Sequence, residues 1–366
     1  MKKRICFFSI GFAFNRLVRM KYYEKIFPKE VEIFLFTTDK YKGKEKDHYQ
    51  FQWDLKRTKI HVEEYGPATL PFRLRNFCNE NKIERLVNLG YFTSCLLLFY
   101  ATIFSSRDFI MNHCANIGYK IKSFKDVFVV LFRYLAFVFF LFSANKTIFV
   151  DYGEYRIYEK LVRFHLLSLS RISYLPAPVN TELFIPKNRK ATRKKLKLPL
   201  NKKIVIFVDR VTHEKGSDLF KEVVESNQDI LFVIIGRIID KEYMNLKTKN
   251  YIHIEKKSSK ELVDYYNAAD MFYHLHRVKR AGIDLTTVES LSVGTPAIIP
   301  FREGIPGVDG LFQVPFSLES ANKTLRNFFK LSEKQKKAFS KKTREYAKKY
   351  YSDDANKEGY IKSYLA

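Results

Sequence analysis

Continuous apolar runs alternate with amphipathic stretches through the second half of the chain, and this pattern restricts the fold more than any other feature. Residues 204–208 and 230–235 are apolar at every position, which is typical of parallel strands buried on both faces. Between these runs, residues 217–226 repeat apolar side chains at the spacing of one helix face. The order strand, helix, strand predicts a parallel sheet covered by helices.

The same alternation continues toward residue 300. Ser258 and Glu261 have the spacing of a capping box, which predicts a helix start at that point. We expect short strands at 252–254, 271–275 and 297–299, and helices at 262–269 and 285–293, the second closed by Gly294. Together these elements predict a doubly wound α/β domain.

The first 180 residues are rich in Phe and Tyr and alternate less regularly. We expect strands at 5–10, 31–36, 59–62, 86–89, 109–111 and 147–150, and helices at 16–26, 93–104 and 125–142. Three prolines between residues 176 and 186 then interrupt any regular element. The sequence therefore predicts two Rossmann-like α/β domains, residues 1–180 and 181–345, joined by a hinge and facing a cleft where ligands bind.

Charge narrows the choice of partners. The chain has 65 Lys and Arg residues against 39 Asp and Glu residues, a formal net charge of +26. Such a charge favours nucleic acid, an anionic membrane or phosphate-bearing substrates. Nucleic-acid binding is the least favoured, because we find no RNA-recognition signature or zinc finger and the basic residues are spread over helices. The basic run at 187–197 fits a solvated helix face or an anionic-surface contact.

Sequence patterns for metal or cofactor binding are absent. The four cysteines are scattered and form no C-x-x-C, and no H-E-x-x-H, D-x-D, G-x-G-x-x-G or Walker loop occurs. A D-x-D pair would be expected if a divalent metal held a nucleotide diphosphate. We therefore expect neither a metal nor a cofactor.

Residues 127–142 are apolar except for Arg133 and the hydroxyl of Tyr134. A helix of this length spans roughly 24 Å, less than the ~30 Å hydrocarbon core, and Arg133 makes spanning less favourable still. This predicts a core helix or a helix docked on a membrane surface, rather than a transmembrane one. The basic and apolar N-terminus lacks a small-residue cleavage site, so we expect a buried first strand there instead of a signal peptide.

Two cations bracket the loop after the predicted strand 204–208. Arg210 leaves the strand, and Lys215 precedes the next helix. Helix N-termini offer free N–H donors and a positive dipole, so the loop suits a pyrophosphate, although an ordinary loop with two surface cations has the same spacing. A second helix starts near residues 282–285. One turn later, Glu289 can accept hydrogen bonds from a vicinal diol or act as a structural glutamate.

Taken in order, these segments resemble the donor-binding domain of the retaining family-four glycosyltransferases of GT-B fold, also called glycosyl transferases group 1. The segments are Arg210 with Glu214-Lys215-Gly216, ELVDYYNAAD at 261–270, ESLSVGTP at 289–296 and GIP at 304–306. The hinge at 177–186 resembles the family's linker. Residues 346–366 resemble its C-terminal helix, which crosses back to the first domain. The resemblance covers roughly residues 174–366 and implies the GT-B fold.

The resemblance gives the diphosphate a set of partners. Arg210 and Lys215 would hold it as catalytic groups and stabilise charge on the leaving group. The backbone amides of Ile283, Asp284 and Leu285 would assist them. Such fixed donors stabilise the departing diphosphate without a metal.

Other roles implied by the resemblance concern the nucleoside and the sugar. Glu289 would hold the ribose hydroxyls, Gly236 would let the chain pass close to the nucleotide, and Gly11 would line the diphosphate side of the cleft. His113 follows the strand 109–111 and would face the transferred sugar as a catalytic residue; it fits a structural histidine equally well. Three further histidines are interpreted as incidental: His213, His274 and His276.

One position departs from the family pattern. The family usually shows two glutamates with seven residues between them, the first touching the donor sugar; counting back from Glu289, this position is Ala281, next to Lys279 and Arg280. Three explanations are open. The donor sugar is unusual, for example acidic; the sugar contact comes from elsewhere; or the protein binds a nucleotide sugar without turning it over.

We expect an enzyme that moves a sugar from a nucleotide-diphosphate donor to a lipid-linked or envelope-glycan acceptor, with retention of configuration and without a metal. The alternatives are a non-catalytic, nucleotide-sugar-binding relative and a basic nucleic-acid-binding protein. The basic charge and the 125–142 helix make an anionic membrane surface a further expected partner. The expected location is the cytoplasm, including the inner face of the membrane.

Overall fold

The computed structural model describes residues 3–9, 14–38, 55–64, 66, 69–89, 108–113, 127–128, 144–150, 152–163, 171–277, 282–302, 305 and 307–366. The chain divides into two compact units. The first unit comprises Met1–Leu175 with Lys357–Ala366, and the second unit comprises Pro176–Asn356. The sequence-based boundaries, after residues 180 and 345, lie later than the first of these divisions and earlier than the second.

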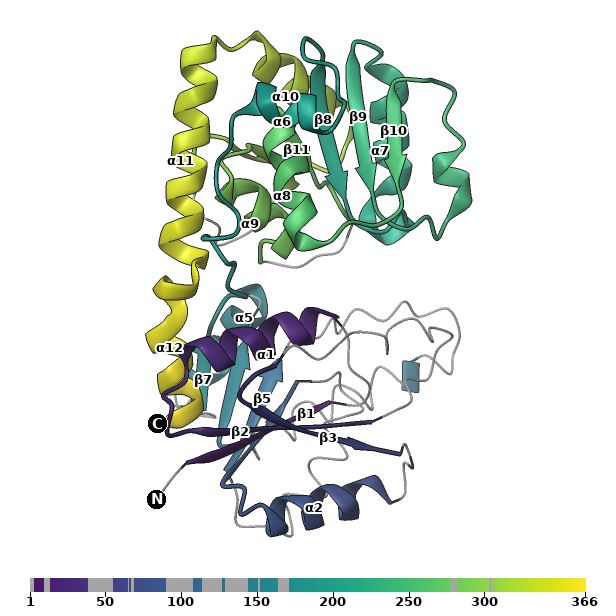
Figure 1. The fold of residues 1–366 in the computed structure, drawn as a ribbon. Coiled ribbons are helices and arrows are strands. Elements are labelled where there is room, and N and C mark those ends of the chain that lie inside the picture. Colours follow the sequence, from purple (N-terminus) through teal and green to yellow (C-terminus); the bar gives the residue numbers. More distant parts are fainter. Residues whose placement is uncertain are drawn as a thin grey trace. The chain divides into compact units, whose positions relative to one another are not determined.

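The first unit is built on a parallel sheet with the strand order β3-β2-β1-β4-β5-β6-β7. The strands are β1 (Arg4–Ser9), β2 (Glu32–Thr38), β3 (Thr58–Glu63), β4 (Arg85–Asn88), β5 (Asp108–His113), β6 (Lys146–Phe149) and β7 (Ile172–Tyr174). Helices α1 (Phe14–Ile26) and α2 (Leu70–Glu80) lie on opposite faces of this sheet, and α5 (Tyr152–Arg163) connects β6 to β7 (Figure 1). The predicted α/β arrangement of this half is confirmed.

Several elements differ from the sequence-based ones, and helices α2 and α5 were not among those expected. Strand β7 was not expected, because its three residues run directly into the first proline of the hinge. The predicted helix at 93–104 lies outside the described residues. Of the predicted helix at 125–142, the structure describes Val127 and Phe128, which are helical and exposed. Among the described residues, no helix is long and apolar enough to cross a membrane.

Aromatic side chains fill one face of the first unit's sheet. Phe7 of β1 stacks on Tyr23 of α1 with ring centroids 4.7 Å apart. The end of the last helix, α12 (Asp353–Leu365), enters the same cluster, where the hydroxyls of Tyr23 and Tyr364 lie 3.1 Å apart. Tyr360 also packs there and donates a hydrogen bond to Leu175 O over 3.5 Å. The core of the first unit therefore includes residues from both ends of the chain.

The second unit contains a parallel sheet with the strand order β10-β9-β8-β11-β12-β13. Its strands are β8 (Lys203–Val208), β9 (Ile230–Ile235), β10 (Tyr251–Ile254), β11 (Met271–Tyr273), β12 (Ala297–Pro300) and β13 (Leu311–Val314). Its helices are α6 (Arg189–Lys195), α7 (Ser217–Ser226), α8 (Ser259–Ala268), α9 (Leu285–Ser292), α10 (Leu318–Lys330) and α11 (Glu333–Tyr351), with 3₁₀ turns η3 (His213–Lys215) and η4 (Lys241–Met244). Strand β13 was not predicted from the sequence.

The strand order of the second unit determines where a ligand can bind. From β8 the chain moves outward to β9 and β10 and then returns to β11 on the other side of β8. Such a reversal leaves a crevice at the carboxyl ends of the two central strands, where ligands bind in open α/β sheets. The loops after β8 and β11 therefore position the candidate site.

The basic run at 187–197 is anchored to the protein rather than fully solvated. Asp270 pairs with Arg189 and Arg193 at 2.9 and 2.8 Å, while Asp264 pairs with Lys187 and Lys195, each at 2.6 Å. Arg193 is only 4% exposed. The expectation of a solvated helix face is wrong for Arg193, which is buried against Asp270, whereas Lys187 and Lys195 pair with Asp264 and remain exposed.

Candidate functional site

The loop between β8 and α7 is held in one tight conformation. Thr212 caps the 3₁₀ turn η3, its hydroxyl accepting a hydrogen bond from the amide of Lys215. Gly216 then adopts a left-handed conformation with φ of 69°, and a Cβ there would lie 2.2 Å from the carbonyl oxygen of Leu275. Only glycine meets both demands at this position. The loop therefore fixes the backbone of Lys215 beside the chain that follows β11.

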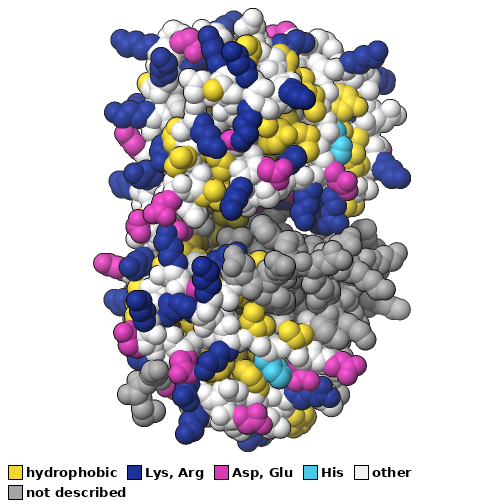
Figure 2. All heavy atoms as spheres, in the orientation of Figure 1, with side chains coloured by type: hydrophobic (Ala, Val, Ile, Leu, Met, Phe, Trp, Pro, Cys, Tyr) yellow, Lys and Arg dark blue, Asp and Glu magenta, His cyan; other side chains and the backbone are white. Residues whose placement is uncertain are grey.

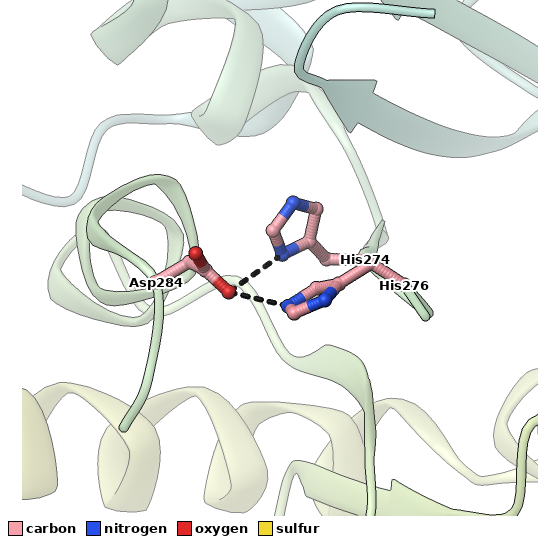
Figure 3. Close-up of side chains that lie close together, drawn as sticks. All are labelled: His274, His276 and Asp284. Atoms are coloured by element: carbon pink, nitrogen blue, oxygen red, sulfur yellow. Dashed lines mark hydrogen bonds and ion pairs between the residues drawn. The ribbon is translucent and has the colours of Figure 1, made fainter. Parts of the chain in front are cut away.

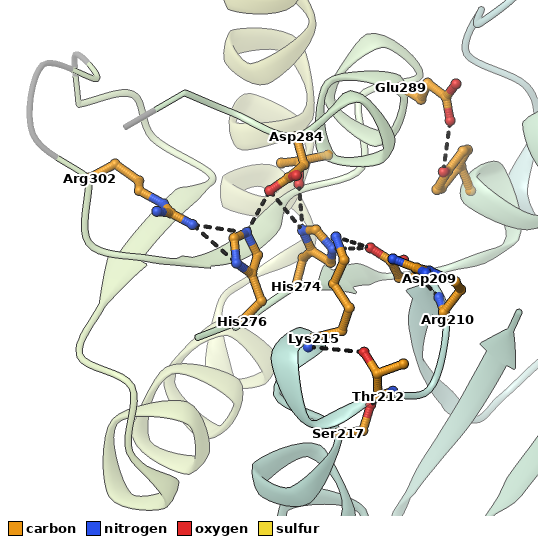
Figure 4. Close-up of polar contacts among 12 residues, drawn as sticks. Asp209, Arg210, Thr212, Lys215, Ser217, His274, His276, Asp284, Glu289 and Arg302 are labelled. Atoms are coloured by element: carbon orange, nitrogen blue, oxygen red, sulfur yellow. Dashed lines mark hydrogen bonds and ion pairs between the residues drawn. The ribbon is translucent and has the colours of Figure 1, made fainter. Parts of the chain in front are cut away.

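Lys215 points inward to a carboxylate. Its Nζ lies 2.5 Å from Asp209 Oδ2, and both side chains are mostly buried. The Nε2 atom of His274 lies 3.2 Å from the same oxygen (Figure 4). Burial by itself would raise the pKa of Asp209, but the contacts with His274 and Lys215 hold that pKa well below its usual value. Asp209 is therefore a permanent negative charge next to the Lys215 ammonium.

Arg210 lies on the same loop as Lys215, but its side chain is exposed. Its amide donates a hydrogen bond to Asp209 Oδ1 over 2.7 Å. Within the described part of the chain, its guanidinium forms no hydrogen bond or ion pair. The two cations predicted to hold a diphosphate thus share one loop. Lys215 is paired with Asp209, whereas Arg210 is available to a ligand.

His274, His276 and Asp284 form a buried cluster beside this pair. The two histidines follow β11 two residues apart, and Asp284 is the N-cap residue of α9. Asp284 Oδ2 lies 2.5 Å from His276 Nε2 and 3.7 Å from His274 Nδ1 (Figure 3). Burial lowers the pKa of His276 to about 4 despite the opposing effect of Asp284, so the ring is neutral near pH 7.

Two further polar side chains contact the histidine rings. The guanidinium of Arg302 lies 2.9 Å from Nε2 and 3.2 Å from Nδ1 of His276. Thr287 Oγ1 lies 3.4 Å from His274 Nδ1. Burial opposes ionisation of Asp284, yet His276 and His274 hold its pKa well below the usual value. A connected polar network therefore runs from Lys215 to Arg302.

The amides of Ile283, Asp284 and Leu285 lie at the start of α9, as predicted. Among the described residues, these three amides have no backbone partner. They can therefore donate hydrogen bonds to an anion bound at this positive helix end. However, the Asp284 carboxylate stands at the same helix end. Its charge already compensates the helix dipole, which the sequence analysis did not anticipate.

Glu289 is buried on α9, and the Tyr266 hydroxyl donates a hydrogen bond to its Oε2 atom over 3.0 Å. Burial raises the pKa of Glu289 to about 7, and the bond from Tyr266 partly offsets that rise. Asp209 is close enough to act electrostatically on the Tyr266 hydroxyl. In Figure 4, Glu289 stands to one side of the Asp209–Lys215 pair. The carboxylate predicted to hold ribose is thus near the loop of the two cations.

Gly236 has a structural reason to be glycine. Its φ is 152°, and a Cβ there would lie 1.8 Å from the carbonyl oxygen of Asp209. The close approach in this structure is therefore to the β8 loop, whereas the sequence analysis expected one to the nucleotide. His113 is the last residue of β5 and pairs in register with Phe149, but its side chain is not described. Gly11 and Ala281 lie outside the described residues.

The sequence analysis missed the network around His274, His276 and Asp284. It interpreted both histidines as incidental, whereas both rings are buried and each contacts an acidic side chain. The available signal was the His-x-His pair directly after a buried strand. An extended chain places side chains two residues apart on the same side.

Comparison with known proteins identifies this part of the chain. Residues 188–348 match the family model described as "Glycosyl transferases group 1". These residues belong to the glycosyl transferases group 1 family. A curated relative, D-inositol 3-phosphate glycosyltransferase of Mycolicibacterium smegmatis, is 26% identical over 162 residues, 40% of this chain and 36% of the relative. The chain thus matches about a third of that relative's length.

Solved structures extend the likeness to the whole fold of the chain. Sucrose-phosphate synthase from Thermosynechococcus elongatus matches with a TM-score of 0.75 at 17% identity, covering 98% of both chains. HepE of Anabaena, solved in complex with UDP-glucose, matches with a TM-score of 0.74 at 10% identity over 98% of both chains. WaaG, a glycosyltransferase of lipopolysaccharide biosynthesis, matches with a TM-score of 0.69 at 15% identity, covering 99% of this chain and all of WaaG. The predicted GT-B α/β fold is confirmed.

Proposed function

We propose that this chain is an active glycosyltransferase that takes a sugar from a nucleotide-diphosphate donor and retains its anomeric configuration. The observation that carries the proposal is the loop after β8, where Lys215 and Arg210 both adjoin Asp209 and Lys215 acts electrostatically on Asp284, the N-cap residue of α9. Departure of a nucleotide diphosphate develops negative charge on oxygen. Fixed cations and helix N-termini aimed at that oxygen stabilise the transition state.

The roles of the site residues follow from their surroundings. Lys215 is already fixed in orientation by Asp209, and a bound diphosphate would compete with that carboxylate for the ammonium. Arg210 is exposed and can close on the diphosphate from the other end of the loop. Glu289, once ionised, can accept two hydrogen bonds from the ribose hydroxyls. We further propose that His113 faces the sugar and that Gly11 lines the diphosphate side of the site.

Incubation of the purified chain with a panel of nucleotide-diphosphate sugars tests the reaction, with release of nucleotide diphosphate as the measurement. We expect Lys215→Ala to lower kcat by at least a factor of about 100, the usual effect of removing one charge-stabilising group. Lys249→Ala is the matched control, because Lys249 is an exposed lysine on the loop before β10. Turnover by Lys215→Ala at the rate of the control would refute the proposed role of the lysine.

The non-catalytic alternative has one observation in its favour. Asp209 and Asp284 place two carboxylates among the groups that would hold the diphosphate, and both oppose an anion. Donor binding without turnover, for every donor and acceptor offered, would support this alternative. An NMR measurement of the product's anomeric configuration separately tests retention, and an inverted product would contradict it.

We also propose a lipid-linked or envelope-glycan acceptor and association with an anionic membrane from the cytoplasmic side. Lys and Arg side chains are spread widely over the visible face of the molecule (Figure 2). On α11, the exposed lysines are Lys334, Lys337, Lys341, Lys342, Lys348 and Lys349. Each basic residue near an anionic surface contributes about 1 kcal/mol of binding.

Flotation with vesicles of phosphatidylserine and phosphatidylcholine tests the membrane proposal. We expect binding at low salt and release at high salt. Replacing Lys334, Lys337 and Lys341 by Gln should weaken binding roughly a hundredfold, from about 3 kcal/mol of lost attraction. Equal flotation of the variant and the natural chain would refute a role for α11. Failure of the natural chain to float with the vesicles would refute membrane association.

A further inference from the structure

We propose that His274, His276 and Asp284 bind a divalent transition-metal ion. Their donor atoms, two imidazole nitrogens and one carboxylate oxygen, all lie within 4.8 Å of one another. Figure 3 shows both rings turned toward the Asp284 carboxylate. Three ligands of this kind, with further positions left to water or substrate, are typical of catalytic rather than structural metal sites.

The fold brings the three ligands together from two segments. His274 and His276 continue the line of β11, so their rings emerge on the same side of the chain. Asp284 is the N-cap of α9, yet its side chain makes no capping hydrogen bond and turns instead to the histidines. A carboxylate that gives up the capping contact is available to a cation. All three residues belong to the second unit, so the site is complete within it.

Metal sites also need groups that orient the ligands, and Asp209 is such a group for His274. Metal-bound histidines almost always donate their other ring N–H to a carboxylate or carbonyl, which fixes the ring and its tautomer. Here Nε2 of His274 lies 3.2 Å from Asp209 Oδ2, which leaves Nδ1 to face Asp284. The Asp209 carboxylate thus orients the ring from behind and contributes negative charge near the metal.

Arg302 is the feature that opposes a cation. Its guanidinium lies 2.9 Å from His276 Nε2, so the metal must displace it together with the proton now between His276 and Asp284. Asp284 offsets part of this cost, whereas the charge of Asp209, which also faces the cluster, is paired with the Lys215 ammonium. The balance predicts tighter metal binding once the guanidinium is removed.

The donor set selects the kind of ion. Mg²⁺ and Ca²⁺ prefer oxygen ligands, whereas imidazole nitrogen suits Zn²⁺ and its transition-metal neighbours. A buried pair of imidazoles with one carboxylate therefore favours Zn²⁺. The expectation of no metal rested on the missing D-x-D pattern, which cannot detect ligands drawn from separate segments.

Zinc titration of the tag-free full chain, stripped with a chelator, tests the site. A chromophoric zinc indicator serves as competitor and reports the Kd directly. We expect one Zn²⁺ per chain, loss of binding in Asp284→Asn and in His276→Ala, and a Kd raised 10- to 100-fold in Asp209→Asn. Arg302→Met should lower the Kd. His253→Gln is the control, since His253 contacts the Gly236 carbonyl outside the cluster.

Co²⁺ provides a readout that needs no variant to fold. The natural chain should give the visible absorption of nitrogen-ligated Co²⁺, and Zn²⁺ should displace it in equal amount. No saturable Zn²⁺ binding, or the same Kd in Asp284→Asn as in the natural chain, would overturn the metal site. Lys215→Ala separates the two proposals, because it should lower kcat for transfer by at least a factor of about 100 and keep zinc binding. Transfer by the natural chain without any zinc binding would refute the metal site alone.

Discussion

Glu289 predicts a measurable pH dependence of stability. Burial raises its pKa to about 7 from the ordinary value of 4.5. The folded state therefore holds the proton more tightly than the unfolded state, and the group stabilises the fold fully below its unfolded pKa. That contribution is lost as the pH rises through about 7. The difference between the two values corresponds to about 3 kcal/mol, of which about 2.5 kcal/mol falls between pH 5 and pH 8.

Urea unfolding of the natural chain and of Glu289→Gln, at pH 5 and at pH 8, measures this contribution. The free energy of unfolding of the natural chain should fall by about 2.5 kcal/mol more than that of the variant over this range. Other ionisable groups change both proteins alike and cancel in the comparison. Glu222→Gln, which removes an exposed carboxylate of α7, is the matched control.

Equal pH dependence in the natural chain and in Glu289→Gln would refute the reasoning, because it would mean that burial does not hold the proton on this carboxyl. Tyr266→Phe gives a second check. The Tyr266 hydroxyl lowers the pKa of Glu289, so its removal should move the loss of stability to higher pH. Donor affinity should depend on pH in the opposite direction to stability. The ribose hydroxyls need the ionised carboxylate of Glu289, so the affinity should rise as the pH increases through about 7.

Three further predictions concern the stability of the two units. Arg193→Met leaves the largely buried Asp270 with one partner fewer and should lower the free energy of unfolding by about 3–5 kcal/mol, against little change in the exposed Lys194→Met. Gly236→Ala forces a Cβ against the Asp209 carbonyl and should lower the Tm by several degrees, whereas Gly307→Ala, which meets nothing within 4 Å, should not. Tyr364→Ala removes a buried ring from the first unit and should cost about 3–5 kcal/mol in urea unfolding.

Strands whose sequences are continuously apolar could be predicted, because burial on both faces leaves no other arrangement for them. Residues 204–208 and 230–235 form β8 and β9 almost at the expected bounds. The capping box of Ser258 and Glu261 was also confirmed, since its hydrogen bonds depend only on neighbours in sequence. Strands β7 and β13 were missed because neither is a continuous apolar run: β7 contains Ser173 and β13 contains Gln313.

The candidate site was only partly predictable, for a related reason. Lys215 and Arg210 share one loop, so their proximity follows from spacing alone. Asp284 turns toward His274 and His276 because α9 packs its first turn against the end of β11, and no local pattern records that packing. The anchoring of Arg193 by Asp270 joins segments far apart in the sequence, so a basic run could not be distinguished from a solvated surface.

The packing of the last helix, α12, affects the order in which the two units can fold during synthesis. Tyr360, Tyr364 and Leu365 belong to the core of the first unit, whose remaining residues leave the ribosome long before them. The second unit is continuous in sequence and can complete its own core earlier. We therefore expect the half that is translated first to become stable only after the second unit and the tyrosines of α12 have been synthesised.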